Sequence, residues 1–425
     1  MSFRFPLVSV MNVAPDPSAD WAAGGGVALT GRADGPPLVP PGRAATYARE
    51  LTDRIHEVTA HTRAPVRVDG AALLAERAAF TGHSRRGRTS AGGACRLLPS
   101  ADGWAAVSCA RPDDPALLGA LVGAPLTADP WPVVAAWVRD HTGAELAERA
   151  ELLGLAAAPV ASPAPVRPAP SPPPPLVPRP VDGLLVVDFS ALWAGPLCGH
   201  LLGLAGARVV KVETPTRPDG ARRGQPEFYR LLHAGHRSVV LDPGTTSGRR
   251  ALAALVASAD IVIEASRPRA LARFGLDAHA AVSAGATWIS LTAAGRVSER
   301  IGFGDDVAAA AGLVARESDG TPLFCGDAVA DPLTGLAAAA RAFTAPADGS
   351  GFLHDIAMSE VVASTLEHAQ GPAAAARRSG TGWVVETTDG FVPVAQPRRR
   401  EPAGDAPGTG EHTTEVLRGL GIPAP

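Results

Sequence analysis

The feature that most constrains the fold is a regular alternation of short apolar runs and helix-like stretches between residues 182 and 345. Runs of this length match buried strands, and the stretches between them have the apolar spacing of helices. Such alternation is typical of βαβ units, which build a mostly parallel sheet with helices on both faces. We therefore predict the α/β class with a Rossmann-like sheet. The expected strands are Leu184–Phe189, Ala207–Glu213, Arg237–Leu241, Ile261–Glu264 and Trp288–Leu291.

A proline-rich segment, residues 156–181, divides the chain. Repeated prolines cannot pair in a sheet or continue a helix, so we expect an extended linker. It separates an N-terminal part, residues 1–155, from a sheet domain at 182–345 and a return segment at 346–425. We expect the N-terminal part to form a smaller α+β domain with helices at 71–80 and 131–155. In the return segment, Asp389-Gly390 predicts a hairpin turn.

The composition is that of a globular protein, with 46% hydrophobic and 19% charged residues. A net charge of -3 and few aromatic residues (5%) give no reason to expect nucleic acid or a membrane surface as a partner. No apolar run has the length of a membrane span, and the N-terminus lacks the long apolar centre of a signal peptide. The four cysteines, Cys95, Cys109, Cys198 and Cys325, show no metal-binding or disulfide spacing. We therefore expect a cytoplasmic protein without a metal.

Asp331-Pro332 follows a short apolar segment and precedes an alanine-rich run. Asp before Pro is a helix start, because Asp accepts a hydrogen bond from a free amide and Pro fits the first helical position. One interpretation makes Asp331 only a helix cap, and spacing alone favours it. The other makes Asp331 a nucleophile beside free N–H groups that could stabilise an oxyanion.

Neither standard nucleotide-binding loop, GxGxxG or GxxxxGK[ST], is present. The first expected strand instead runs into residues 190–196 and then a helix. Backbone amides at such a helix start can hold a phosphate, although this signal is weak when taken alone.

Two stretches of the chain resemble each other. Residues 19–38 match residues 305–323 in their Ala/Gly-rich run and the following Asp-Gly and Pro-Leu pairs. Extending the match places Thr46 opposite Asp331. If the segments are related, only the second keeps the acid; the alternative is chance similarity between segments of low complexity.

Five stretches occur in the order of one family's motifs: Val187–Pro196, Leu204–Glu213, His236–Asp242, Glu264–Gly275 and Gly326–Gly335. Together they resemble the family III CoA-transferases, also called the CaiB/BaiF family, which include formyl-CoA and carnitine CoA-transferases and α-methylacyl-CoA racemases. Residues 410–417 are similar to the family's closing motif. Residues 102–159 look like its small domain, which here precedes the catalytic part, so the order is rearranged.

The resemblance implies an enzyme that moves CoA from an acyl-CoA donor to a carboxylic acid acceptor, with CoA bound as a substrate and no permanent cofactor. A homodimer is also implied by the family, although the rearrangement leaves this open. Asp331 takes the place of the catalytic aspartate. The implied CoA contacts are Trp193, Ala194, Gly195, Arg237, Ser266, Arg267 and Arg273, with Gly92 and Gly93 in a loop that covers the site. By base rate alone, Arg237 and Arg273 could equally be surface arginines.

Departures from the family pattern leave alternatives. Gly304-Asp305-Asp306 stands where the racemase branch has a Gly-His-Asp motif, which argues against an Asp/His racemase. A racemase or isomerase that pairs Asp331 with Asp305 or Asp306, and a CoA-binding protein without activity, remain as rivals. A dinucleotide-dependent oxidoreductase is disfavoured by the missing GxGxxG.

Overall fold

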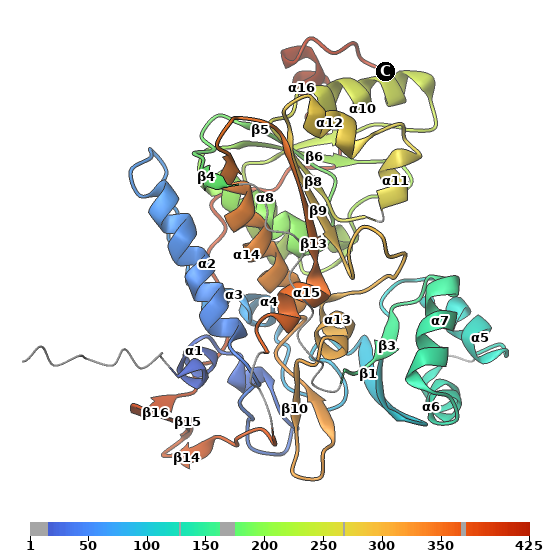
Figure 1. The fold of residues 1–425 in the computed structure, drawn as a ribbon, viewed down its shortest axis with the longest axis vertical. Coiled ribbons are helices and arrows are strands. Elements are labelled where there is room, and N and C mark those ends of the chain that lie inside the picture. The colour runs from blue at the N-terminus through green and yellow to red at the C-terminus, as the bar shows by residue number, and fades with distance from the viewer. Residues whose placement is uncertain (1–15, 127–128, 162–174, 267, 367–370) are drawn as a thin grey trace, which may run out of the picture.

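A six-stranded parallel sheet forms the centre of the molecule (Figure 1). The structure is a computed structural model that describes residues 16–126, 129–161, 175–266, 268–366 and 371–425. The strand order is β13-β9-β8-β5-β6-β7, and every neighbouring pair is parallel. This confirms the predicted α/β class. The strands are β5 (Leu185–Asp188), β6 (Arg208–Glu213), β7 (Arg237–Val240), β8 (Ile261–Glu264), β9 (Thr287–Thr292) and β13 (Phe352–Ala357).

Helices cover both faces of this sheet, because its strands alternate buried side chains between two cores. Val186 joins the core with α8 (Ala194–Leu204) and α14 (Ala330–Ala342). Leu185 and Val187 join the other core, with α10 (Thr246–Ala257) and α16 (Thr413–Gly419). The remaining helices near the sheet are α9 (Pro226–His233), α11 (Pro268–Ala272), α12 (Ala278–Ser283) and α15 (Met358–Ala363).

The first part of the chain packs onto the sheet domain. Helix α2 (Ala44–Thr59) lies against α14, and α1 (Pro17–Ala23) buries Trp21 in the same core. The predicted helix at 71–80 is two short helices, α3 (Gly70–Leu73) and α4 (Glu76–Thr81). The break places Leu74 in the sheet-domain core and Ala75 in a separate small cluster with Leu29.

Residues 95–159 form an antiparallel sheet with its own apolar core. Its strands are β1 (Cys95–Ser100), β2 (Gly103–Ser108) and β3 (Ala157–Pro159), covered by α5 (Asp114–Val122), α6 (Trp131–Arg139) and α7 (Gly143–Leu153). The single helix predicted at 131–155 is wrong. Thr142 starts a new helix, because its hydroxyl accepts from the Glu145 amide while the Glu145 carboxylate accepts from the Thr142 amide (2.8 Å).

Several short elements carry no clear periodicity in the sequence. Helix α13 (Gly304–Ala310) is alanine-rich and leads into the hairpin β10 (Val314–Arg316) and β11 (Pro322–Phe324). The hairpin predicted at Asp389-Gly390 is confirmed as β15 (Gly382–Thr387) and β16 (Gly390–Pro393). The other elements are β14 (Arg377–Ser379), the pair β4 (Leu176–Pro178) and β12 (Thr344–Pro346), and the 3-10 turns η1 (Val27–Leu29) and η2 (Gly220–Arg223).

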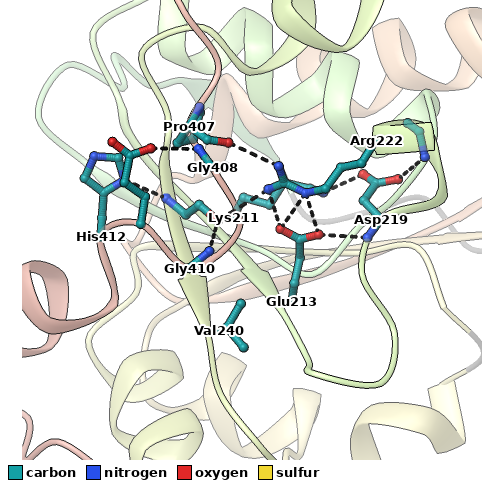
Figure 2. A network of polar contacts seen from close by, with 12 residues as sticks. Lys211, Glu213, Asp219, Arg222, Val240, Pro407, Gly408, Gly410 and His412 are labelled. Atoms are coloured by element: carbon teal, nitrogen blue, oxygen red, sulfur yellow. Dashed lines mark hydrogen bonds and ion pairs between the residues drawn. The ribbon is translucent and has the colours of Figure 1, made fainter. Parts of the chain in front are cut away.

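Residues 395–413, the C-terminal strap, close the edge of the sheet (Figure 2). The outward amides of edge strand β7 are satisfied by side chains of the strap: the Ser238 amide donates to His412 Nδ1 (3.2 Å) and the Val240 amide to Thr413 Oγ1 (3.0 Å). Arg222 holds both oxygens of Glu213 and donates to the Pro407 carbonyl (3.1 Å). The edge strand is thereby protected from pairing with another chain.

Candidate active site

Asp331 lies in the first turn of α14, where a tight turn joins the helix to β11. Gly326 (φ 65°) and Ala328 (φ 50°) both adopt left-handed backbone. For Ala328 this conformation is unfavourable and typical of a functional turn. The helix begins at Ala330, after Val329 at the cap position. The expectation that Asp331 caps the helix is therefore wrong, because the turn starts the helix one residue earlier.

Asp331 is a partly buried residue. A Cβ atom at Gly304 would lie 2.6 Å from Asp331 Oδ2, so the glycine makes room for the carboxyl group. No described residue donates a hydrogen bond to either carboxyl oxygen. Burial raises its pKa to about 7, helped by the charges of Asp305, Asp306 and Asp327 and opposed by Arg77. The group is near half ionisation at neutral pH.

Asp327, four residues earlier, has the opposite environment. It is fully buried, and the guanidinium of Arg77 holds both its oxygens (Nε to Oδ2, 2.9 Å). His83 Nδ1 lies 3.3 Å from Oδ2. Burial alone would raise the pKa of Asp327, but Arg77 and His83 outweigh it and hold the pKa below its usual range. Of the two carboxylates in this segment, only Asp331 is available to a substrate.

Two further carboxyl groups complete the cluster. Asp305 is half-buried and accepts from the Ala328 amide at 2.9 Å, which fixes the left-handed turn before α14. Asp306 is buried and accepts from the Phe303 amide and the Ser108 hydroxyl, both at 2.9 Å. Burial raises the pKa of both groups to about 6.

Arg77 connects this cluster to the predicted CoA-binding residues. Its guanidinium carbon lies 4.9 Å from the centroid of the Trp193 ring. A Cβ atom at Gly92 would lie 3.8 Å from Arg77 Nη2 and 3.3 Å from His83 Cε1, so the glycine loop passes close to this pair. Sequence analysis missed Arg77 and His83. Their spacing in the sequence does not mark them as site residues. They reach the site through the packing of α4 and of the segment that follows it.

The C-terminal strap fixes α4 in this position. Arg400 holds both oxygens of Glu76, the first residue of α4, at 2.8 Å each. Its Nη1 lies 3.1 Å from Nε2 of His200 on α8. Glu76 is buried, so the contact has little competition from water. Arg77 is thus positioned by contacts that reach both α8 and the strap.

The loop that starts α8 approaches α14 one turn after Asp331. A Cβ atom at Gly335 would lie 2.6 Å from the Ala194 carbonyl oxygen, so the two helices cross in close contact there. Trp193, Ala194 and Gly195 are all buried. Leu192, just before them, has φ 68°, and its amide donates to Asp219 Oδ1 at 3.0 Å. Lys211 holds the other oxygen of Asp219 at 2.9 Å (Figure 2).

Ser266 and Arg273 lie farther along the sheet, near the end of β8. Ser266 is partly buried and Arg273 is exposed after α11. A pocket of about 460 Å³ opens beside them. It is lined by Glu264, Leu271, Ala272, Gly275, Leu276, Asp277, Ala278, Trp288 and Arg296.

The remaining predicted contacts are Arg237, Arg267 and Gly93. Arg237 lies on edge strand β7, is half exposed and pairs with Glu415 at 3.4 Å. Arg267 lies outside the described residues. Gly93 follows Gly92 in the glycine loop, with φ 84°. Among the residues the structure describes, no group of three or more His, Cys, Asp or Glu side chains could hold a metal ion. No described helix is long and apolar enough to cross a membrane.

The family model of CoA-transferase family III matches residues 181–412, and the chain belongs to this family. It is 30% identical over 247 residues to the succinyl-CoA--D-citramalate CoA-transferase of Chloroflexus aurantiacus, a match that covers 54% of this chain and 60% of that protein. It is 31% identical over 211 residues to the succinate--glutarate CoA-transferase of Agrobacterium fabrum (44% and 53%).

The chain is also 30% identical over 185 residues to the formyl-CoA:oxalate CoA-transferase of Rhodopseudomonas palustris, with 37% and 40% covered. A solved CaiB/BaiF family protein from Brucella suis aligns with a TM-score of 0.42 at 27% identity, over 51% of this chain and 65% of that one. The chain thus spans less than two thirds of the length of these relatives.

Proposed function

We propose that this protein transfers CoA from an acyl-CoA donor to a carboxylic acid acceptor, with Asp331 as the nucleophile. The observation that carries the proposal is a contrast within one segment. Asp327 is held in an ion pair, whereas Asp331 is partly exposed, accepts no hydrogen bond from a described residue, and lies in the first turn of a helix. The relatives named above act on succinate, citramalate, glutarate or oxalate, and small dicarboxylic acids are accordingly the first acids to test.

The chemistry follows from a carboxylate beside a thioester. An oxygen of ionised Asp331 attacks the thioester carbonyl carbon, the C–S bond breaks, and a mixed anhydride and CoA thiolate result. The thiolate attacks the Asp331 carbonyl carbon, which releases the donor acid and leaves an aspartyl-CoA thioester. The acceptor carboxylate attacks this thioester and expels the thiolate. Attack of the thiolate on the acceptor carbonyl then yields the new acyl-CoA and restores Asp331.

Each of these steps passes through an oxyanion, which needs donors close to the reacting carbonyl. The backbone amides of Gly92 and Gly93 and of the first turn of α14 are the candidates. Arg77 opposes the rise in the pKa of Asp331 and so keeps more of it ionised. The loop at Trp193, Ala194 and Gly195 and the pocket beside Arg273 would accommodate CoA, with its nucleotide end toward the pocket.

Trapping the aspartyl intermediate tests the proposal. The protein is incubated with succinyl-CoA and its intact mass is measured before and after hydroxylamine, which cleaves thioesters and anhydrides. We expect an adduct with the mass of CoA less one water. Hydroxylamine should release CoA from it and leave the aspartyl hydroxamate, and Asp331→Asn should lack the adduct. Asp305→Asn is the matched control, because it also removes one carboxylate of the cluster but keeps the nucleophile. Absence of an adduct with every donor of an acyl-CoA panel would leave a CoA-binding protein without transferase activity.

A second candidate is exchange of the proton next to the thioester carbonyl, as in a racemase. Two partly buried residues, Asp305 and Asp331, favour this function. Burial raises the pKa of Asp305 to about 6 and that of Asp331 to about 7, and both residues adjoin Gly304. An acid and a base at such pKa values suit proton transfer near neutral pH. Incubation of 2-methylacyl-CoA in D₂O separates the two functions: deuterium uptake without acyl transfer supports the racemase.

A further inference from the structure

Leu192 has an unfavourable backbone conformation at the exposed end of the loop before α8. Its φ is 68°, a left-handed value that a leucine rarely adopts, and 43% of the residue is exposed. The next three residues, 193–195, are buried, so a ligand meets this loop at the exposed residues Ala191 and Leu192. A side chain this exposed gains little from packing, so other contacts must hold the strained backbone. Such strained residues cluster at ligand sites.

The buried carboxylate of Asp219 holds Leu192 in this conformation. Its Oδ1 accepts from the Leu192 amide at 3.0 Å and from the Ala221 amide at 2.9 Å. The second contact caps the turn η2, whereas the first reaches across to a different loop. The Asp219 side chain is only 1% exposed, so water competes little for this charged acceptor. Asp219 therefore fixes the direction of the Leu192 amide and with it the left-handed turn.

Asp219 is itself held firmly by buried charges (Figure 2). Lys211 Nζ lies 2.9 Å from Asp219 Oδ2 and donates to the Ser190 carbonyl at 2.6 Å, so Lys211 holds the loop at Ser190 as well. The Asp219 amide donates to Glu213 Oε1 at 2.8 Å. Arg222 holds both oxygens of Glu213 and donates to the strap at the Pro407 carbonyl. A rigid, buried network thus ends on the backbone of an exposed turn.

Capping of η2 and pairing with Lys211 would explain Asp219 without any ligand. The bond to Leu192 lies outside both roles, however, and it maintains an unfavourable conformation that folding stability alone does not require. The loop also continues directly into Trp193, whose ring centroid lies 4.9 Å from the guanidinium carbon of Arg77. The exposed turn is therefore one residue from the contact that joins this loop to the cluster around Asp331.

We propose that Asp219 is a positioning residue for acyl-CoA: it holds Leu192 in its left-handed conformation and so keeps the exposed end of the loop in the shape that CoA contacts. This inference rests on the proposed function for the identity of the ligand. Asp219 does not touch CoA, because its carboxylate is buried and occupied by Leu192, Ala221 and Lys211. Its loss therefore weakens the binding of CoA and leaves the chemistry at Asp331 intact.

A double-mutant cycle between positions 219 and 192 tests this role, with CoA binding measured by isothermal titration calorimetry. We expect Asp219→Ala to weaken CoA binding about tenfold, as for a lost hydrogen bond to a charged group. In a Leu192→Gly background the same change should cost no more than about threefold, because glycine adopts left-handed backbone freely. With succinyl-CoA as donor, KM of Asp219→Ala should rise about tenfold while kcat stays within about threefold of wild type.

Asp16→Ala is the matched control. Asp16 likewise accepts from an amide of its own helix, that of Ser18 (2.9 Å), and from a distant amide, that of Thr388 (3.0 Å), neither of which belongs to this loop. We expect its CoA affinity to match that of wild type within about twofold. A loss as large as that of Asp219→Ala would mean that the effect is not specific to the loop, and would overturn the inference.

Leu192→Ile keeps the test decisive if Asp219→Ala does not fold, since position 192 is exposed and no buried charge loses its partner. A branched Cβ atom opposes left-handed backbone, so we expect this variant to bind CoA at least about threefold more weakly than Leu192→Gly. Equal affinities of these two variants would overturn the inference. A folding defect is recognised separately, because it lowers the number of binding sites in the titration and leaves Kd unchanged.

The remaining outcomes separate this inference from the proposed function. Equal losses from Asp219→Ala in the Leu192 and Leu192→Gly backgrounds overturn the inference, even if the wild-type protein transfers CoA. The expected coupling in CoA binding, without transfer from any donor of the acyl-CoA panel, refutes the proposed function alone. Failure of the wild-type protein to bind CoA refutes both.

Discussion

Arg32 and Glu317 occupy corresponding positions in the two similar stretches of the chain, and their side chains pair with each other (Nε to Oε1, 2.7 Å). The same spacing in sequence places Thr46 opposite Asp331. The elements correspond as well, with α1 matching α13 and α2 matching α14. The matching helices α2 and α14 pack together, as equivalent elements do across a two-fold interface. The N-terminal stretch therefore packs against the stretch that carries Asp331, and Thr46 occupies the position that corresponds to Asp331.

Charge reversal tests the contact between the two copies. Both side chains are partly exposed (50% for Arg32, 25% for Glu317), so the pair is worth little alone. We expect Arg32→Glu or Glu317→Arg to lower the midpoint of urea unfolding slightly, and the double reversal to restore most of the loss. Urea unfolding measures each variant. Simple addition of the two losses in the double variant would show that the side chains do not interact in solution.

Removing Arg77 tests the buried ion pair beneath the site. Asp327 has no exposed surface, so Arg77→Met leaves a buried charge without its partner. We expect a loss of about 3 kcal/mol in the free energy of unfolding, measured in urea at pH 8. Arg77→Met combined with Asp327→Asn regains most of this stability, because no unpaired charge remains. Arg398→Met is the control: its pair with Asp69 is exposed on both sides, and we expect a change within about 0.5 kcal/mol.

The sheet and the position of Asp331 could be predicted from the sequence, because both depend on local patterns. Runs such as Leu184–Phe189 and Ile261–Glu264 are largely buried and are apolar except for Asp188 and Glu264, a pattern that indicates strands of a parallel sheet. The family resemblance placed Asp331 through motifs in a fixed order. The family model confirms that resemblance, whereas the role of Asp331 itself stays a prediction.

The positions of Arg77 and His83 beside Asp327 could not be predicted from the sequence, because they come from tertiary packing. In the sequence, a single arginine in a predicted helix cannot be distinguished from an arginine exposed to solvent. Contacts of α4 with the strap and with α8, made through Arg400, help to place Arg77 beside Asp327. Likewise, α13 has seven residues and no apolar stripe, so its sequence does not reveal that Gly304 adjoins the carboxyl group of Asp331. The helix start at Ala330 was missed because a left-handed alanine is not a recognised turn signal.

Asp331 lowers the stability of the folded protein at neutral and alkaline pH. Its pKa rises from 3.8 to about 7 on folding, so the folded protein holds this proton more tightly than the unfolded chain. The contribution of Asp331 to the free energy of unfolding therefore falls as pH rises from about 4 toward 7. We expect Asp331→Asn to be more stable than wild type by up to about 4 kcal/mol at pH 8, with the difference closing near pH 4. Thermal unfolding at both pH values measures this.

Asp327→Asn supplies a control of opposite sign for that experiment. The pKa of Asp327 is depressed in the folded state, so its contribution is present at pH 8 and is lost as pH falls. This variant should be less stable than wild type at pH 8 and approach it in acid. An Asp331→Asn protein that is less stable than wild type at pH 8 would mean that the Asp331 carboxyl is not strained by burial.

The pH dependence of CoA transfer should report the same carboxyl group. Under the proposed function, only the ionised form of Asp331 attacks the thioester, so kcat/KM should rise with pH and level off above an apparent pKa of about 7. Asp305→Asn removes a negative charge that raises this pKa, and we expect the rising limb to move to lower pH. Arg77→Met removes the charge that opposes the rise, so the limb should move to higher pH. The two shifts are measured with a saturating acceptor and limiting donor. If the rising limb of the pH profile stays in place in both variants, the titration belongs to a different group. Loss of folded enzyme cannot explain a shift, because it lowers the height of the profile and leaves its position on the pH axis unchanged.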